Sequence, residues 1–132
     1  MICILQERFA GKHEKAKKWI SDVVGVATKI LLKLDNPVKL TPVGNIEYIE
    51  DTLLPNPPTL KRLSGLRRKK LTSYFCGNEA DGNSGFAYFH SACNNLGAAV
   101  NVNAFSDDVI QAGRTLAQQL GHNLGIGSVF LS

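Results

Sequence analysis

Apolar and polar positions recur along the chain in patterns that predict both helices and strands. The longest pattern runs from His13 to Leu34, where apolar residues recur every three or four positions and lysines fall between them. This spacing predicts a long amphipathic helix that ends before Pro37. A second amphipathic pattern follows Ser106, the expected N-cap, and continues to Gly125, the expected C-cap.

Shorter apolar runs predict the strands of a sheet. Strands are expected at Ile2–Leu5, at Val38–Glu50 with a disturbance near Pro42, at 72–75, at 85–93 as an inner strand, and at 98–105 as the second strand of a hairpin, at an edge. A basic helix is expected over residues 59–71. The resulting order predicts an α/β layer arrangement with a mixed sheet.

The composition is typical of one globular domain. The 132 residues, of which 44% are hydrophobic and 20% charged, suffice for one core but not comfortably for two. No apolar run approaches the ~18–20 residues of a membrane span, and Ile2–Leu5 is too short for the core of a secretory signal. Taken at face value, the product is intracellular; taken as a piece of a longer chain, its N-terminus says nothing about location.

The charge of the chain adds a further expectation. The net charge is +4, and six basic residues fall within ten positions: Lys61, Arg62, Arg67, Arg68, Lys69 and Lys70. This cluster could bind a polyanion, but no aromatic residues interleave it, so a solvated basic face is the simpler interpretation and nucleic acid is not an expected partner.

The three cysteines match no zinc-ribbon or CxxC spacing. Cys3 lies in an apolar run and is expected to be a buried small hydrophobe. Cys76 and Cys93 lie among glycines and asparagines, as cysteines with disulfide partners often do. Those partners are either each other or cysteines in a segment outside this chain.

The candidate functional site lies in residues 115–128, TLAQQLGHNLGIGS. On a helix, positions 118 and 122 share a face and 119 lies beside them. A zinc protease of this spacing has His at 118 and 122 as ligands and Glu at 119 as general base; after a turn at 125, a third His follows at 128. The positions are occupied by Gln118, Gln119, His122, Gly125 and Ser128. The sequence therefore predicts no catalytic residue, no metal ligand set and no cofactor, with these five as vestigial active-site positions.

Other residues offer no replacement chemistry. His13 and His90 do not fall at a spacing that would bring them beside His122. No nucleophile elbow is present, and the loop glycines form no phosphate-binding fingerprint.

Three segments carry a resemblance to a known family. GFAYFHSAC at 85–93 is similar to a Gly-Leu-Ala-Tyr-Val-Gly-x-x-Cys strand, and AAVNVNAF at 98–105 takes the place of an edge strand that lines a substrate cleft. TLAQQLGHNLGI at 115–126 is similar to Thr-Met-Ala-His-Glu-Leu-Gly-His-Asn-Leu-Gly-Met. Together they resemble the metalloprotease domain of the ADAM/reprolysin family of metzincins, and the Gln-Gln form resembles its catalytically inactive, adhesion-type ADAM branch.

The resemblance implies a fold and a domain organisation. The fold is an α/β, metzincin-like N-terminal subdomain, with a twisted, mixed, mostly parallel sheet that has an antiparallel edge strand and is packed by helices. Residues 1–132 are expected to be a single partial domain that lacks the family's Met-turn and C-terminal subdomain. In the family, the cysteine corresponding to Cys93 pairs with one in the missing part.

Two functions from different classes follow. The expected one is a pseudoprotease that acts as a protein-binding or cell-adhesion module of an ADAM-type protein. It has a protein partner outside the cell or at its surface, no zinc, and membrane attachment only through missing segments. The alternative is a reprolysin-family zinc metalloendopeptidase whose weak site is completed by groups from outside this chain. A third possibility is a fragment with no independent role.

Overall fold

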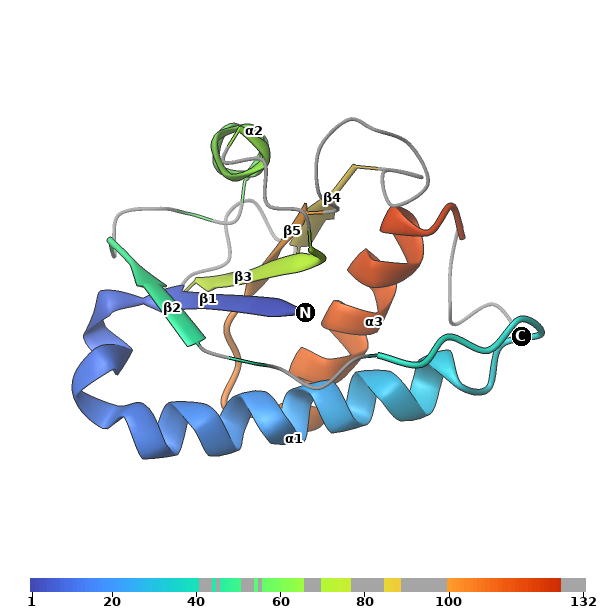
Figure 1. Ribbon diagram of the computed structural model, residues 1–132, viewed down its shortest axis with the longest axis horizontal. Coiled ribbons are helices and arrows are strands. Elements are labelled where there is room, and N and C mark those ends of the chain that lie inside the picture. The colour runs from blue at the N-terminus through green and yellow to red at the C-terminus, as the bar shows by residue number, and fades with distance from the viewer. Residues whose placement is uncertain are drawn as a thin grey trace.

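The computed structural model describes residues 1–40, 44, 46–50, 54, 56–65, 70–76, 85–88 and 100–126. Figure 1 shows the arrangement of the elements. In chain order they are β1 (Ile2–Gln6), the 3-10 helix η1 (Glu7–Lys12), α1 (His13–Leu31), β2 (Ile46–Ile49), α2 (Pro57–Ser64), β3 (Thr72–Cys76), β4 (Gly85–Ala87), β5 (Val100–Ala104) and α3 (Val109–Asn123).

The strands form one sheet in the order β2-β1-β3-β5-β4. β1 pairs in parallel with β2 and β3, and β3 pairs in parallel with β5. β4 pairs antiparallel with β5 at one edge. The expected α/β fold, with a mostly parallel sheet and an antiparallel edge strand, is therefore confirmed.

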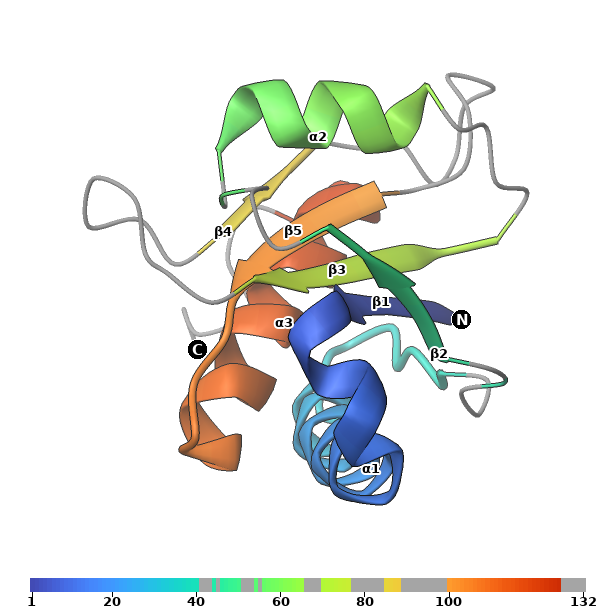
Figure 2. The same cartoon turned by 90° about the vertical axis from the view of Figure 1, so that its left-hand side faces the viewer.

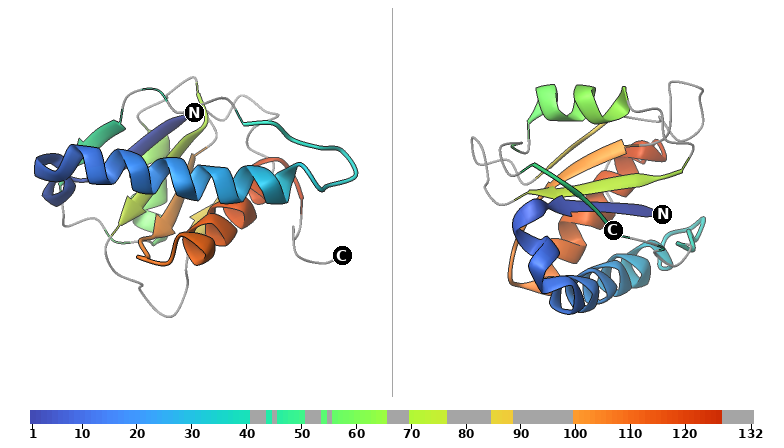
Figure 3. Two further views of the ribbon diagram at one scale, coloured as in Figure 1. Left: turned by 90° about the horizontal axis from the view of Figure 1, so that it is seen from below. Right: turned by 60° about the vertical axis from the view of Figure 1, so that its left-hand side comes forward.

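The helices cover the two faces of the sheet unequally. α1 and α3 pack on one face and α2 on the other (Figure 2). Because strand side chains alternate between faces, Cys3 and Phe75 point into the core under α1 and α3, whereas Tyr74 and Val102 point into the core under α2. Viewed from below, α1 runs across the strands with α3 beside it (Figure 3).

The predicted positions of two strands in the sheet were wrong. The segment at 98–105, expected at an edge, forms β5, which lies between β3 and β4; the segment at 85–93, expected inside, contributes the edge strand β4. The antiparallel hairpin pairing of the two is confirmed. The error arose because Asn101 and Asn103 alternate with valines as if they faced water, yet both asparagines are fully buried beneath α3.

Several element boundaries also moved. α1 ends at Leu31 rather than Leu34, and the strand expected over Val38–Glu50 is reduced to β2, with residues 41–43 and 45 outside the described part. The helix expected at 59–71 begins earlier, at Pro57, because the Asn56 side chain caps it by accepting from the Thr59 N–H at 3.1 Å. Its basic residues Lys61 and Arg62 are exposed, and Arg62 forms an ion pair with Glu50 at 2.6 Å.

The N-cap of α3 is Asp108, two residues after the expected Ser106. The Asp108 carboxylate accepts from the N–H groups of Ile110 at 3.0 Å and Gln111 at 3.3 Å. Ser106 still contributes, since its hydroxyl accepts from the Asp108 N–H at 3.1 Å. A carboxylate at this end also complements the helix dipole.

Cys76 occupies a different environment from the polar loop expected for it. It ends β3, is fully buried, and its thiol donates to the Asn103 carbonyl at 3.5 Å. The structure gives no support to a disulfide at this position; Cys93 lies outside the described residues. Cys3 is fully buried, as expected. In the described part of the chain, no helix is long and apolar enough to cross a membrane.

Candidate functional site

Helix α3 presents three different surfaces. Ala112, Leu116 and Leu120 pack into the core shared with α1. Gln119 and Asn123 are buried against the β4–β5 side of the sheet, and Gln118 and His122 are half-buried. The site positions named from the sequence are thus divided between two surfaces of one helix.

Gln118 and His122 are joined directly, with their Nε2 atoms 3.0 Å apart. This confirms that positions 118 and 122 share a face. An amide nitrogen can only donate a hydrogen bond, so this contact engages the lone pair of His122 Nε2. The hydrogen bond occupies the imidazole lone pair that a metal ion at Nε2 would require.

Gln119 is directed away from this pair, toward the edge of the sheet. Only 6% of its surface is exposed. Its side chain fills the space beside Gly85 in β4, where a Cβ atom would lie 3.0 Å from both Cγ and Cδ of Gln119. Gln119 Oε1 is buried and has no hydrogen-bond donor among the described residues. The amide therefore acts as a packing group between α3 and β4.

Asn123 was not singled out from the sequence, yet it anchors the helix to the sheet. It is fully buried, and its Nδ2 donates to the carbonyls of Tyr88 and Val100, each at 3.1 Å. Its Oδ1 accepts from Asn101 Nδ2 at 2.9 Å. The signal in the sequence is the four-residue step from Gln119 to Asn123, which places both amides on one helix face.

The polar contacts continue along β5. Asn103 Nδ2 donates to Asn101 Oδ1 at 2.8 Å and to the Tyr74 carbonyl at 3.2 Å. Buried amides need such partners, because an unpaired polar group costs about 1–3 kcal/mol. The network thus fixes the carboxyl-terminal half of α3 relative to β3, β4 and β5.

The turn predicted at Gly125 is confirmed. Gly125 has φ 85°, which favours glycine, and follows the C-cap Leu124. The Gly125 N–H donates to the His122 carbonyl at 3.0 Å and the Ile126 N–H to the Gly121 carbonyl at 2.8 Å, the two bonds of a Schellman motif. Ser128 lies outside the described residues.

The described residues at this site do not fit a zinc ion. Across the part of the chain that the structure describes, no three His, Cys, Asp or Glu side chains come together as a metal-binding group. Catalytic zinc takes three such ligands, whereas the described residues of this site offer one imidazole, already hydrogen-bonded, and the neutral amide of Gln118. His13 lies elsewhere, with its Nδ1 2.7 Å from the Tyr48 hydroxyl. His90 is outside the described residues.

Comparison with known proteins agrees with this fold. No curated protein is similar enough to this chain to count as a match. A chain in a solved structure of a chaperone–substrate complex has a TM-score of 0.63 and 15% sequence identity, covering 95% of this chain and 22% of that chain. At this identity the likeness concerns the fold alone. The family model of the reprolysin (M12B) zinc metalloproteases matches residues 5–129, and the chain therefore belongs to the reprolysin family.

Proposed function

We propose that this chain is a pseudoprotease: a reprolysin-type domain that keeps the active-site helix and has lost its chemistry. Gln118, Gln119 and Ser128 stand where active members have His, Glu and His. The observation that carries the proposal is the hydrogen bond between Gln118 and His122 at 3.0 Å. Two positions that would share a metal ion instead bind each other.

The loss of the general base supports the same conclusion. An amide cannot accept a proton near neutral pH, so Gln119 cannot activate a water molecule. Its side chain is also buried against Gly85 rather than presented to a substrate. Without the metal and the base, both main contributions to peptide hydrolysis are missing.

We further propose that the domain acts as a protein-binding or cell-adhesion module of an ADAM-type protein of the adhesion branch. The scaffold supports this role, because the Asn123 network holds α3 against β4 and β5 without any metal. Directly after the edge strand β4, Tyr88 keeps 41% of its surface exposed. Exposed tyrosines beside a rigid element are typical of protein-binding surfaces.

On this proposal, residues 1–132 are one partial reprolysin-type domain of a longer chain outside the cell or at its surface. Its partner is an extracellular or cell-surface protein, and attachment to a membrane is left to other segments. We propose no nucleic-acid partner; on α2, Arg62 forms an ion pair with Glu50. The domain needs no cofactor.

Zinc analysis tests the loss of chemistry. The chain is purified in the presence of zinc, dialysed, and measured for metal content and for cleavage of a mixed peptide library. We expect metal well below one zinc per chain, unchanged by His122→Ala, and no cleavage. One zinc per chain that is removed by a chelator and lost in His122→Ala would establish the alternative, a zinc endopeptidase. Cleavage by the wild-type chain would do the same.

Cell adhesion tests the proposed role. Suspended fibroblasts are counted on surfaces coated with the folded chain, with the urea-unfolded chain, or with Tyr88→Ala. We expect adhesion to the folded chain only, and a reduction of severalfold for Tyr88→Ala. A control variant, Gln111→Ala on the exposed face of α3, should behave as wild type. Equal adhesion to the folded and unfolded chain would contradict an adhesion role.

A further inference from the structure

A groove lies between α1 and α3, which run side by side in the view from below (Figure 3). Its walls come from Val26, Lys29 and Ile30 of α1 and from Ile110 and Arg114 of α3. The volume is about 390 Å³, within the roughly 300–1,000 Å³ of binding pockets. Two packed helices offer such a groove to the side chains of a third helix.

The apolar part of the groove is incompletely covered. Ile110 has 55% of its surface exposed, the largest fraction among the large hydrophobic side chains that the structure describes. Val26 and Ile30 are half-buried. Apolar side chains placed among these three residues would remove the remaining surface from water. The groove therefore favours a partner with apolar residues over a purely polar polyanion.

The two charged wall residues, Lys29 and Arg114, are both cationic and both exposed. Among the described residues, no carboxylate lies within ion-pair distance of the Lys29 ammonium. The Arg114 guanidinium has five N–H donors, so it can bind a carboxylate in addition to any other partner. The walls therefore complement a partner that carries acidic residues.

The acidic residues of these two helices do not cancel this charge. Asp22 lies one turn before Val26 on α1 and is paired with Lys18 at 3.0 Å. Asp107 and Asp108 precede α3, and the Asp108 carboxylate caps the first N–H groups of that helix. All three acids precede the wall residues along the chain, so the two cations define the positive end of the groove.

We propose that this groove binds an acidic amphipathic helix of a partner protein. The apolar face of the partner helix packs on Val26, Ile30 and Ile110, and carboxylates beside that face pair with Lys29 and Arg114. This is the helix-in-groove mode of recognition. The surface contains none of the residues assigned to the pseudoprotease or adhesion role, and the proposal does not depend on that function.

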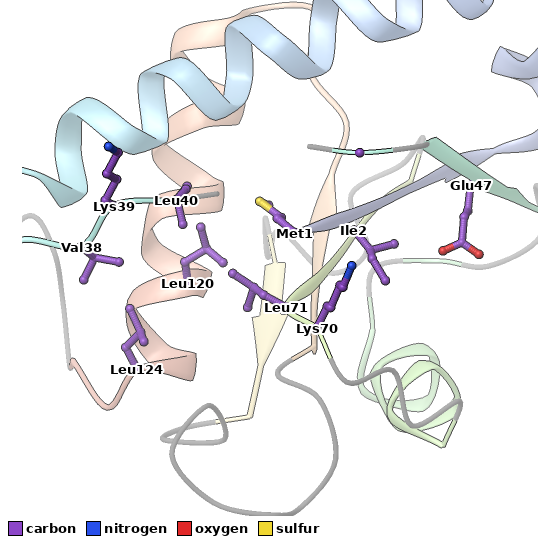
Figure 4. Close-up of a pocket in the computed structure, with 11 residues that line it drawn as sticks. Met1, Ile2, Val38, Lys39, Leu40, Glu47, Lys70, Leu71, Leu120 and Leu124 are labelled. Atoms are coloured by element: carbon purple, nitrogen blue, oxygen red, sulfur yellow. The ribbon is translucent and has the colours of Figure 1, made fainter. Parts of the chain in front are cut away.

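A larger cavity of about 750 Å³, at the end of the sheet where β1 and β3 begin, provides a control site (Figure 4). Leu71 packs against the core under α1 and α3, whereas the preceding residue, Lys70, points to the opposite face of the sheet. Lys70 is exposed and carries the same charge as Lys29. Lys70→Glu is therefore a matched charge reversal away from the groove.

Fluorescence anisotropy with a labelled peptide tests the proposal on the 132-residue chain. The peptide is a helix with leucines on one face and glutamates beside them. One matched peptide has serines in place of the leucines, and another has lysines in place of the glutamates. We expect saturable binding of the first peptide only, and weaker binding at high salt because ions screen the charge pairs. Methyl NMR spectra should show shifts at Val26, Ile30 and Ile110 and none at Leu71 or Leu124.

Substitutions locate the contact. Lys29→Glu and Arg114→Glu should each lower the affinity about tenfold, because each replaces an attraction by a repulsion. Ile110→Ser should lower it about tenfold by removing apolar contact. Lys70→Glu should leave the affinity nearly unchanged. All four side chains are exposed, so each variant should fold, which circular dichroism will show.

Four binding results would overturn the proposal: no saturation up to about 1 mM peptide, equal binding of the serine peptide, tighter binding of the lysine peptide, or equal losses in Lys29→Glu and Lys70→Glu. Self-association of the chain without peptide, if lost in Ile110→Ser, would also overturn it by assigning the groove to a second copy of this chain.

Discussion

Asn123 of α3 accepts a hydrogen bond from Asn101 of β5 at 2.9 Å, and both side chains are completely buried. The same Asn123 amide donates to the carbonyls of Tyr88 and Val100. One side chain therefore connects α3 to β5 and to Tyr88, the residue that follows the edge strand β4. This connection fixes the carboxyl-terminal half of α3 on the sheet.

Replacing Asn123 by Ala should destabilise the chain strongly. The change removes the hydrogen bonds of Asn123 to the Tyr88 and Val100 carbonyls and to the Asn101 amide, for which we expect a loss of about 3 kcal/mol in the free energy of unfolding. Urea titration followed by circular dichroism measures it. Gln111→Ala, on the exposed side of the same helix, is the control and should change stability by less than about 0.5 kcal/mol. A similar small change in Asn123→Ala would mean that the network carries little of the stability.

Gln119 should tolerate an apolar replacement better than Gln118 does. Gln119→Met removes a buried acceptor that has no donor among the described residues, so stability should be unchanged or rise by about 1 kcal/mol. Gln118→Met breaks the hydrogen bond with His122 and should cost about 0.5–1.5 kcal/mol. Thermal unfolding compares the two variants. If Gln119→Met were instead the less stable of the two variants, the Gln119 amide would have a hydrogen-bond partner in solution.

Gly113 should not tolerate a methyl group. A Cβ atom at this position would collide with the Val26 side chain and lie 3.0 Å from the Val23 carbonyl oxygen of α1. We expect Gly113→Ala to cost about 2–3 kcal/mol through overpacking between the helices. Gly25→Ala is the matched control, since its Cβ would meet nothing within 4 Å, and it should stabilise α1 by about 0.5–1 kcal/mol. Equal effects of the two substitutions in urea unfolding would contradict close packing of α1 on α3.

Trp19, the single tryptophan, should report on the junction between α1 and the segment before α3. Its Nε1 donates to the Ser106 carbonyl at 2.9 Å, and its ring stacks on Phe105 with the centroids 4.7 Å apart. Trp19→Phe loses the hydrogen bond and part of the stacking, which should cost about 2 kcal/mol. Denaturant unfolding of the variant measures the loss. In the wild type, unfolding should shift the tryptophan emission to longer wavelength; an emission maximum already at the unfolded position would contradict this contact.

Cys3 should be chemically inert in the folded chain. Burial raises the pKa of its thiol from 9.0 to about 12, so the reactive thiolate is scarce at pH 8. Mass spectrometry after iodoacetamide treatment should find Cys3 unmodified in buffer and modified in urea.

The same shift makes a prediction about stability and pH. Above pH 9 the unfolded thiol loses its proton while the folded thiol keeps it, so the free energy of unfolding should fall as pH rises from 9 toward 12. This decline should be smaller in Cys3→Ala. Rapid modification of Cys3 in the folded chain, or the same decline in the variant, would contradict its burial.

The periodicity of the sequence predicted α1 and α3 well, because each helix has one continuous apolar face and little else competes for it. The end of α3 depended on a local glycine turn, so the turn at Gly125 was predicted correctly, although the C-cap itself is Leu124. The predicted N-cap of α3 was wrong because both Ser106 and Asp108 have side chains that can cap a helix. The path of the chain after β5 decides between them, since it places the Asp108 carboxylate beside the N–H groups of Ile110 and Gln111.

The same patterns did not predict the order of the strands in the sheet. An alternation of valine and asparagine is typical of a strand that exposes one face to water. Asn101 and Asn103 instead face helix α3, whose Asn123 amide accepts a hydrogen bond from Asn101. Cys76 was misjudged for a similar reason. The glycine and asparagine residues that follow it suggest a loop, but pairing with β5 buries the thiol inside the sheet.

By itself, the sequence determined the helices, the α/β class and the identity of the residues at positions 118, 119 and 122. These follow from local periodicity and from residue chemistry, which do not depend on distant contacts. Only the tertiary structure decided that Gln119 packs on Gly85 and that Asn123 anchors the helix. Both depend on where β4 and β5 lie against α3, and such long-range packing leaves no periodic signal in the chain. The contact between Gln118 and His122 lies within one helix and follows from their four-residue spacing.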